Sequence, residues 1–190
     1  MKRNLVFLSV TGLIMLAVLM NTGNTFAVDS LKGNWSLGLY SALNHSEIET
    51  AAAETYESDL KILNASLGYF WTDHIEISFS PTFATLEVEG AEMSVYNYFG
   101  SLQYNFYSSG WQAVPYIGLQ AGMTGIELKY EDDSYEDTDF SFGWMGGLKA
   151  FLTENVSLDI EYNWLYTPDL LADLTMSTIF IGFTWYFGGN

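Results

Sequence analysis

The final stretch of the chain, from Thr178 to Phe187, alternates between apolar and smaller or more polar residues. Its apolar positions share one parity: Ile179, Ile181, Phe183, Trp185 and Phe187. Recurrence at every second position indicates a β-strand, because successive side chains of a strand point to opposite faces. A strand face that is this apolar must contact apolar surroundings, either a protein core or the hydrocarbon of a membrane.

Seven earlier stretches repeat this alternation, so the sequence predicts eight strands. The earlier stretches are Gly33–Leu43, Asp59–Trp71, Ile75–Leu86, Met93–Tyr107, Ala113–Leu128, Phe140–Leu152 and Val156–Tyr166. Short turns at Thr72, Ser108 and Thr153 alternate with longer loops from Asn44, Glu87, Lys129 and Thr167. An even number of strands with alternating short and long connections predicts an all-β, eight-stranded antiparallel transmembrane β-barrel, with both termini at the short-turn rim.

Smaller features predict local departures from this pattern. Pro81 lacks a backbone N–H, which indicates a bulge or a locally unpaired position. The alternation changes near Gly125, which predicts a second bulge. Ala51–Ala53 predicts a short helical turn within the first long loop, and Glu87–Glu92 and Lys129–Asp139 are expected to be acidic loops.

The first 27 residues have the features of a secretory signal peptide. Lys2 and Arg3 precede an apolar run from Leu5 to Met20, and Thr25–Ala27 provides a small-x-small cleavage site before Val28. The alternative is an uncleaved anchor, but the run is short for a spanning helix, which needs roughly 18 residues or more. We expect residues 1–27 to be removed and residues 28–190 to form the barrel.

Composition restricts the partners of residues 28–190. The chain has no cysteine, so no disulfide stabilises it. Its basic residues after position 27 are Lys32, Lys61, Lys129 and Lys149, against 23 acidic residues. Nucleic acid is therefore excluded as a partner, because phosphate binding requires a basic surface.

A soluble eight-stranded barrel with an apolar interior is the alternative fold. Three features favour the membrane. The polar parity is rich in Gly, Ser, Thr and Asn rather than in Lys and Glu, and Tyr and Trp concentrate near strand ends, as in interfacial girdles. The chain also finishes on an aromatic strand, with only Gly188–Asn190 beyond it.

Two segments resemble small outer-membrane barrels of the OmpA, OmpX and OmpW kind. Pro115–Gly122 resembles a Pro-Tyr-x-Gly strand of that family, and Phe142–Leu148 followed by Leu158–Tyr162 resembles its next hairpin. The resemblance implies the outer membrane of a Gram-negative bacterium, contact with outer-membrane lipid and lipopolysaccharide, and insertion by the barrel assembly machinery. The closing strand resembles the C-terminal assembly signal of that family, which assigns this role to Phe183, Trp185 and Phe187.

Four charged residues share the inward parity: Glu76, Lys149, Asp159 and Glu161. The interior of an eight-stranded barrel is just wide enough to be filled by side chains, and buried charges must be paired. The sequence therefore predicts a charge network around Lys149 that fills the lumen. The alternative is a gate or a narrow ion path.

Other candidate sites are weak. His45 and His74 are expected at opposite rims, roughly 25 Å apart, so they cannot share a metal or a triad. Glu131–Asp139 could bind Ca²⁺, but it lacks the sequence order of ligand residues in an EF-hand loop. The same segment could bridge weakly to lipopolysaccharide phosphates through divalent cations. We expect no catalytic residue, no cofactor and no resident metal.

Three functional hypotheses follow. The first is a structural or surface-interaction barrel with a filled lumen and acidic extracellular loops. The second is a narrow, porin-like channel or transporter for ions or small hydrophobic molecules, as OmpW-like proteins would imply. The third is a lipid-modifying enzyme, for which Asn44–Ser46 is the only candidate, and we expect no enzyme.

Overall fold

The computed structural model describes residues 30–42, 47–49, 55–57, 59–88, 91–130, 133–168 and 174–188. The predicted signal peptide and the predicted helical turn at Ala51–Ala53 lie outside these ranges. No helix within the described ranges is long and apolar enough to cross a membrane.

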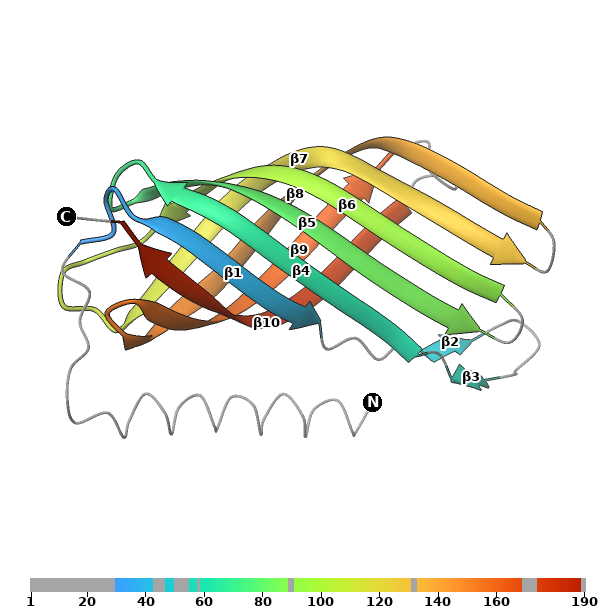
Figure 1. Ribbon diagram of the computed structural model, residues 1–190, viewed down its shortest axis with the longest axis horizontal. Coiled ribbons are helices and arrows are strands. Elements are labelled where there is room, and N and C mark those ends of the chain that lie inside the picture. The colour runs from blue at the N-terminus through green and yellow to red at the C-terminus, as the bar shows by residue number, and fades with distance from the viewer. Residues whose placement is uncertain are drawn as a thin grey trace.

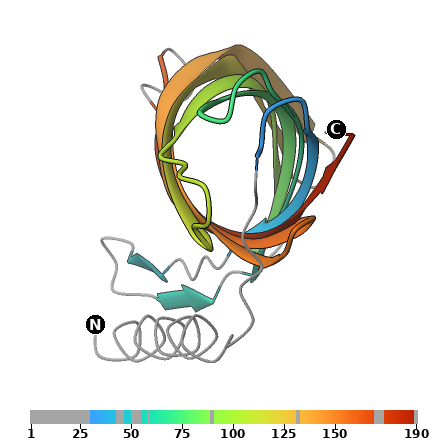
Figure 2. The same cartoon turned by 90° about the vertical axis from the view of Figure 1, so that its left-hand side faces the viewer.

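Within these ranges, eight strands close into an antiparallel barrel (Figures 1 and 2). Their order around the wall is β1-β10-β9-β8-β7-β6-β5-β4. The barrel strands are β1 (Trp35–Ala42), β4 (Asp59–Phe70), β5 (Ile75–Val88), β6 (Ala91–Asn105), β7 (Ala113–Tyr130), β8 (Asp133–Thr153), β9 (Val156–Thr167) and β10 (Leu174–Phe187). A separate hairpin pairs β2 (Glu47–Glu49) with β3 (Thr55–Glu57), inside a segment that we expected to be a loop.

Strand β10 closes the barrel by pairing on both edges. Ile181 is opposite Ile160 of β9, and Phe183 is opposite Leu39 of β1. These pairings leave no free edge at the junction between the first and last strands, as a membrane-spanning sheet requires. Strand β10 therefore closes the sheet into a barrel.

Side chains divide between the two faces as the alternation predicts. Apolar residues on the outer face are strongly exposed, with Leu119 at 69%, Leu63 at 60% and Leu102 at 55%. The buried inward positions are rich in hydroxyl and amide groups: Ser36, Asn64, Ser78, Thr82, Asn97, Ser101, Gln103, Asn105, Gln120, Ser141, Asn163 and Thr184. An apolar exterior around a polar interior is the reverse of a soluble barrel and is typical of membrane barrels.

Two predicted loops prove to be largely strand. Strands β5 and β6 extend through most of Glu87–Glu92, and β7 and β8 form a long hairpin through most of Lys129–Asp139. Backbone pairing continues there without apolar alternation, because the hydrogen bonds of the sheet do not depend on side-chain polarity. We name residues 124–130 of β7 and 133–141 of β8 the outer hairpin, in which Thr124 pairs with Asp139 and Tyr130 pairs with Asp133.

The two predicted irregularities have different outcomes. The register of β4 against β5 is kept on both sides of Pro81, but the pairs that would include Pro81 and Ser80 are missing. This confirms a locally unpaired position on the β4 edge, while Pro81 still pairs with Tyr98 of β6. The bulge predicted near Gly125 is wrong. The register runs through Gly125 on both edges of β7. Only the chemistry of the inward face changes there, because Ile126 follows polar inward residues.

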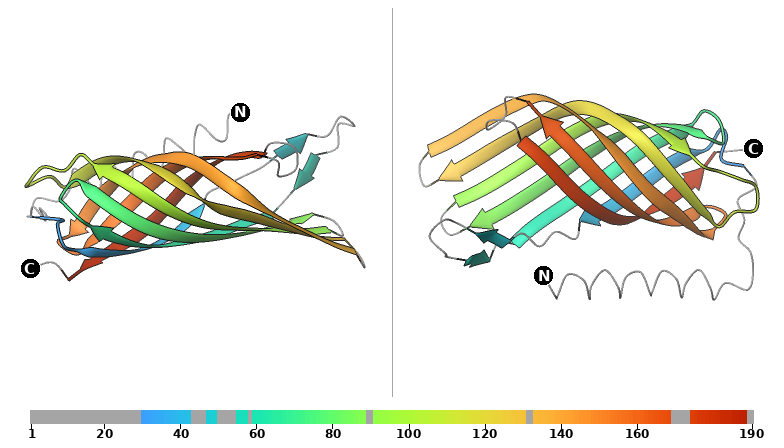
Figure 3. Two further views of the ribbon diagram at one scale, coloured as in Figure 1. Left: turned by 90° about the horizontal axis from the view of Figure 1, so that it is seen from above. Right: turned by 180° about the vertical axis from the view of Figure 1, so that it is seen from behind.

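The short connections lie at the same end as the C-terminus (Figure 1). One of them, between β6 and β7, contains Gly110 with φ of 86°, a backbone conformation that strongly favours glycine. At the opposite end, β7 and β8 extend beyond β9 and β10 (Figure 3). The wall of the barrel is therefore higher on one side than on the other.

Candidate functional site

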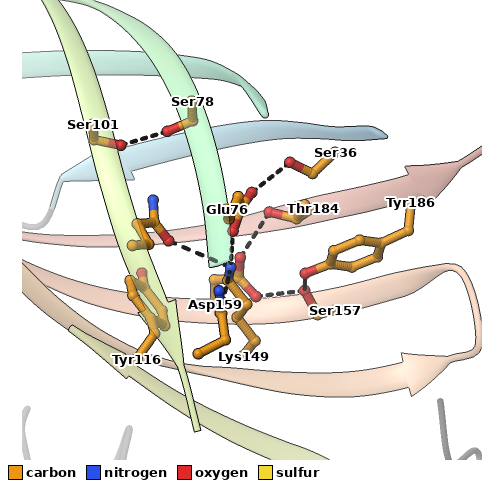
Figure 4. A network of polar contacts seen from close by, with 12 residues as sticks. Ser36, Glu76, Ser78, Ser101, Tyr116, Lys149, Ser157, Asp159, Thr184 and Tyr186 are labelled. Atoms are coloured by element: carbon orange, nitrogen blue, oxygen red, sulfur yellow. Dashed lines mark hydrogen bonds and ion pairs between the residues drawn. The ribbon is translucent and has the colours of Figure 1, made fainter. Parts of the chain in front are cut away.

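The lumen contains a buried ion pair between Lys149 Nζ and Glu76 Oε2 (Figure 4). Lys149 also donates to Asn105 Oδ1 at 3.0 Å and to Gln103 Oε1 at 3.4 Å. The second carboxylate oxygen of Glu76 accepts a hydrogen bond of 2.6 Å from Ser36 Oγ. The ammonium group and the carboxylate are thus satisfied in the interior, as buried charges require.

Asp159, which we predicted to be near Lys149, is its register neighbour on β9 but is bound by other groups. Its Oδ1 accepts from Ser157 at 2.5 Å, and its Oδ2 accepts from Thr184 at 2.7 Å and Tyr40 at 3.1 Å. The Ser157 hydroxyl in turn contacts the Tyr186 hydroxyl at 2.9 Å (Figure 4). Asp159 therefore links β1, β9 and β10.

Glu161 is bound by a third set of partners. Its Oε2 accepts from the Tyr116 hydroxyl at 2.5 Å, and its Oε1 accepts from Asn163 Nδ2 at 2.6 Å. Gln120 Nε2 donates to Asn163 Oδ1 at 2.7 Å. The four predicted residues share one level of the lumen, which we name the charged layer. Only Lys149 and Glu76 contact each other directly.

Sequence reasoning missed the two tyrosines of this layer. Tyr40 and Tyr116 lie on the inward parity and are buried. A Cβ at Gly38 or Gly182 would overlap Tyr40, and a Cβ at Gly147 would overlap Tyr116. Inward tyrosines beside inward glycines could have identified this packing from the sequence.

An apolar cluster closes the lumen between the charged layer and the short-turn rim. We name it the inner plug, and it consists of Leu31, Phe70, Val114, Phe151 and Tyr186, each at most 5% exposed. Lys149 Nζ lies 5.0 Å from the centre of the Phe70 ring, so the plug contacts the charged layer directly. Leu31 precedes β1, so the chain segment before the barrel contributes to its closure.

Asp73 fixes the segment that carries Leu31. Its Oδ1 accepts hydrogen bonds from Ser30 Oγ and Leu31 N, both at 2.7 Å, and from Lys32 N at 2.9 Å. Partial burial alone would raise the pKa of Asp73. The three hydrogen bonds, together with neighbouring His74, outweigh that effect and hold the pKa below its usual value. The carboxylate therefore anchors the segment in its charged form.

A cavity of about 280 Å³ lies on the other side of the charged layer. Lys149 and Glu76 line it, and its wall then continues through the apolar residues Val95, Met93 and Met176 towards the outer rim. The plug residues are absent from its lining. The open space of this cavity therefore lies on the outer side of the charged layer.

The histidine and metal predictions have separate outcomes. His74 lies at the short-turn rim, where its ring stacks on Tyr104 and its Nδ1 is 3.1 Å from Asn105 O. His45 and Ser46 lie outside the described residues. Where the chain is described, no three His, Asp or Glu residues are placed to hold a metal ion. Weak divalent-cation binding by the acidic segments stays a prediction.

The residues of the predicted assembly signal share the lipid-facing side of β10. Phe183, Trp185 and Phe187 are 41–49% exposed. They contribute no group to the lumen, so any role they have is separate from the charged layer.

Comparison with known proteins assigns the family. Residues 13–187 match the family model described as outer membrane protein beta-barrel domain. Among curated proteins, none matches the chain.

Solved structures show the same fold at low sequence identity. Neisserial surface protein A matches with a TM-score of 0.65 and 16% identity, covering 82% of this chain and 98% of that one. The N-terminal barrel of Pseudomonas aeruginosa OprF matches with a TM-score of 0.58 and 14% identity, over 82% and 98%. Ail of Yersinia pestis matches with a TM-score of 0.54 and 15% identity, over 82% and 99%. The chain therefore belongs to the outer-membrane β-barrel protein family, as an eight-stranded barrel of the outer membrane of a Gram-negative bacterium.

Proposed function

We propose that this protein acts at the cell surface as an interaction barrel whose lumen is closed. The observation that supports this role most strongly is the continuous filling of the lumen by the inner plug and the charged layer. A barrel closed in this way anchors and displays its outer segments. Contact with outer-membrane lipid and lipopolysaccharide, and insertion by the assembly machinery, are part of the same proposal.

The outer hairpin is the proposed contact element. Strand β9 pairs with β8 only from Phe142 towards the short-turn rim. Residues 133–141 therefore have one edge on which no described strand pairs. An exposed edge presents backbone N–H and C=O groups in the spacing that an added strand requires.

The charge of the outer hairpin indicates the partner. Glu127, Glu136, Asp137 and Asp139 outnumber Lys129, which already pairs with Glu127 at 2.9 Å. Opposite charges guide association at a solvated surface, so we propose an extended, basic protein segment that pairs with the edge of β8. Ail has been solved with sucrose octasulfate, a heparin analogue. The acidic hairpin of the present chain does not suit such a polyanion.

Amide hydrogen exchange on protein in lipid nanodiscs tests the proposal, with a peptide of alternating lysine and threonine as the probe. We expect the peptide to protect residues 134–141 and to bind more weakly as salt increases. The triple variant Glu136→Gln, Asp137→Asn, Asp139→Asn should lose this protection. The matched control Glu154→Gln, at the opposite rim, should keep it. Absence of protection, or equal loss in the control, would refute the proposal.

The second candidate function, a narrow channel or transporter, is favoured by one observation, the cavity on the outer side of the charged layer. A channel needs that cavity to continue through the charged layer and the plug. Single-channel recording in a planar bilayer separates the two functions, since the closed barrel should show no discrete openings.

A further inference from the structure

On the outer side of the charged layer, β5, β6, β7 and β10 carry apolar inward side chains. Val95 and Ile126 are buried there, at 9% and 0% exposure. They pack with Ala84, Met93, Leu128 and Met176. These residues continue the inward parity of their strands, on which the deeper positions carry mainly hydroxyl and amide groups.

The outer face of the wall changes in the opposite sense at this height. Tyr96 donates a hydrogen bond of 2.7 Å to Glu136, and Lys129 pairs with Glu127. On β6 and β7 the wall is thus apolar inside and polar outside, which is the arrangement of a soluble ligand-binding barrel, whereas β8 carries Asp137 on the inward side opposite Ile126. The reversal indicates that this part of the wall has left the hydrocarbon layer and encloses an apolar space in water.

The cavity already described occupies this space. We name its apolar part the outer cup, and its lining includes Ile62, Ala84, Met93, Val95, Leu165 and Met176. The volume of the whole cavity, about 280 Å³, is close to the lower end of ligand pockets, roughly 300 Å³. The charged layer and the plug close its deep end, so it has the dimensions of a binding site for one small molecule.

One polar group in the cup lacks a partner. Asn97 is 6% exposed and lines the cavity, yet its Oδ1 is buried without a hydrogen bond from any described residue. Its cross-strand neighbours Thr82 and Thr124 accept hydrogen bonds from Asn64 and Ser141, and neither hydroxyl donates to Asn97 Oδ1. A buried acceptor without a donor costs free energy, which a ligand O–H or N–H group would recover.

Charge selects among such ligands. The lumen below Asn97 holds the carboxyl groups of Glu76, Asp159 and Glu161 against the single ammonium group of Lys149. This excess of carboxyl groups disfavours an anionic head group next to Asn97. A neutral hydroxyl or a cationic amine is not repelled by these carboxyl groups, and it supplies the hydrogen-bond donor that Asn97 Oδ1 lacks.

We propose that the outer cup binds a small neutral or cationic amphiphile, with its O–H or N–H head group on Asn97 Oδ1 and its chain along the apolar rim. The polar head points towards the charged layer, and the hydrocarbon contacts Val95, Met93 and Met176. This site is independent of the outer-hairpin edge, so each can fail without the other.

The test is a titration of isotope-labelled protein in nanodiscs with 1-octanol, octylamine and octanoate, followed by NMR. We expect saturable shifts of the Asn97 side-chain amide and of the Val95 and Ile126 methyl groups with 1-octanol and octylamine, but not with octanoate. Probe that dissolves only in lipid would shift the outward residues Ile117 and Leu119 instead, and that outcome would overturn the proposal.

Two variants and a control define the site. Asn97→Leu removes the acceptor and should weaken 1-octanol binding about 2- to 10-fold, the effect of one hydrogen bond. Ala84→Leu occupies part of the cup and should abolish saturable binding. Ser78→Ala alters a lumen hydroxyl outside the cavity lining and should leave binding unchanged. Retained heat-modifiable mobility on a gel confirms that each variant is folded. Unchanged binding in the folded Asn97 and Ala84 variants would refute the site.

Discussion

Lys149 of β8 forms an ion pair with Glu76 of β5 inside the barrel, although β6 and β7 separate these two strands in the wall. The pair therefore crosses the lumen rather than lying along one side of it. Ser36 extends the connection to β1, and Asn105 extends it to β6. One network of side chains thus connects strands from around the barrel and fills the cross-section of the lumen at this level.

Replacing Lys149 by methionine should destabilise the barrel by about 3–5 kcal/mol, because Glu76 would remain buried without its cation. The double variant Lys149→Met, Glu76→Leu should recover most of this loss, since no uncompensated charge remains. Urea unfolding in lipid vesicles measures both values. The control Lys129→Met removes an exposed pair with Glu127 and should cost less than about 1 kcal/mol. Equal costs for the two lysines would contradict the account of the charged layer.

The anchor of the inner plug should depend on pH. The pKa of Asp73 is below its ordinary value of about 3.9. Its stabilisation is therefore complete above that value and is lost as the pH falls through the lower folded-state pKa. The loss should be about 1 kcal/mol, because the group is partly exposed. NMR shifts of the Leu31 and Lys32 amides between pH 7 and 2 should report it, and Asp73→Asn should remove the dependence. A transition that persists in the variant would refute the assignment.

The stability cost of a lysine substitution should differ between two outward positions on neighbouring strands, because only one of them contacts lipid. Leu119 of β7 lies on the strongly apolar face, whereas Thr138 of β8 lies on the outer hairpin. Leu119→Lys should cost about 2–4 kcal/mol, and Thr138→Lys about 0–1 kcal/mol, because the penalty for lysine falls towards the membrane surface. Vesicle unfolding measures both. Similar penalties at the two positions would mean that the outer hairpin lies within the hydrocarbon.

The last strand should matter more for insertion in cells than for final stability. Phe187→Ala should lower the amount of protein in the outer membrane, while purified protein still refolds into vesicles. Ile179→Ala alters the same lipid-facing side of β10 away from the C-terminus and provides the control. Cell fractionation measures insertion. Equal losses for the two variants would remove the special role of the terminal aromatic residue.

The sequence predicted the strand number, the sidedness and the inward placement of Lys149 because each depends on period-2 alternation. It did not predict that Glu76 rather than Asp159 meets Lys149, since contact across a lumen depends on barrel closure and strand stagger. The length of the outer hairpin was also missed. Residues such as Glu136 and Asp137 lack apolar alternation, and backbone pairing alone continues the sheet there.

The most direct test of the closed lumen is single-channel recording of the refolded wild-type protein in a planar bilayer. The inner plug and the ion pair between Lys149 and Glu76 predict a silent bilayer, with no discrete openings across the voltage range that the membrane tolerates. Reproducible openings whose conductance changes in Lys149→Met would contradict a closed lumen.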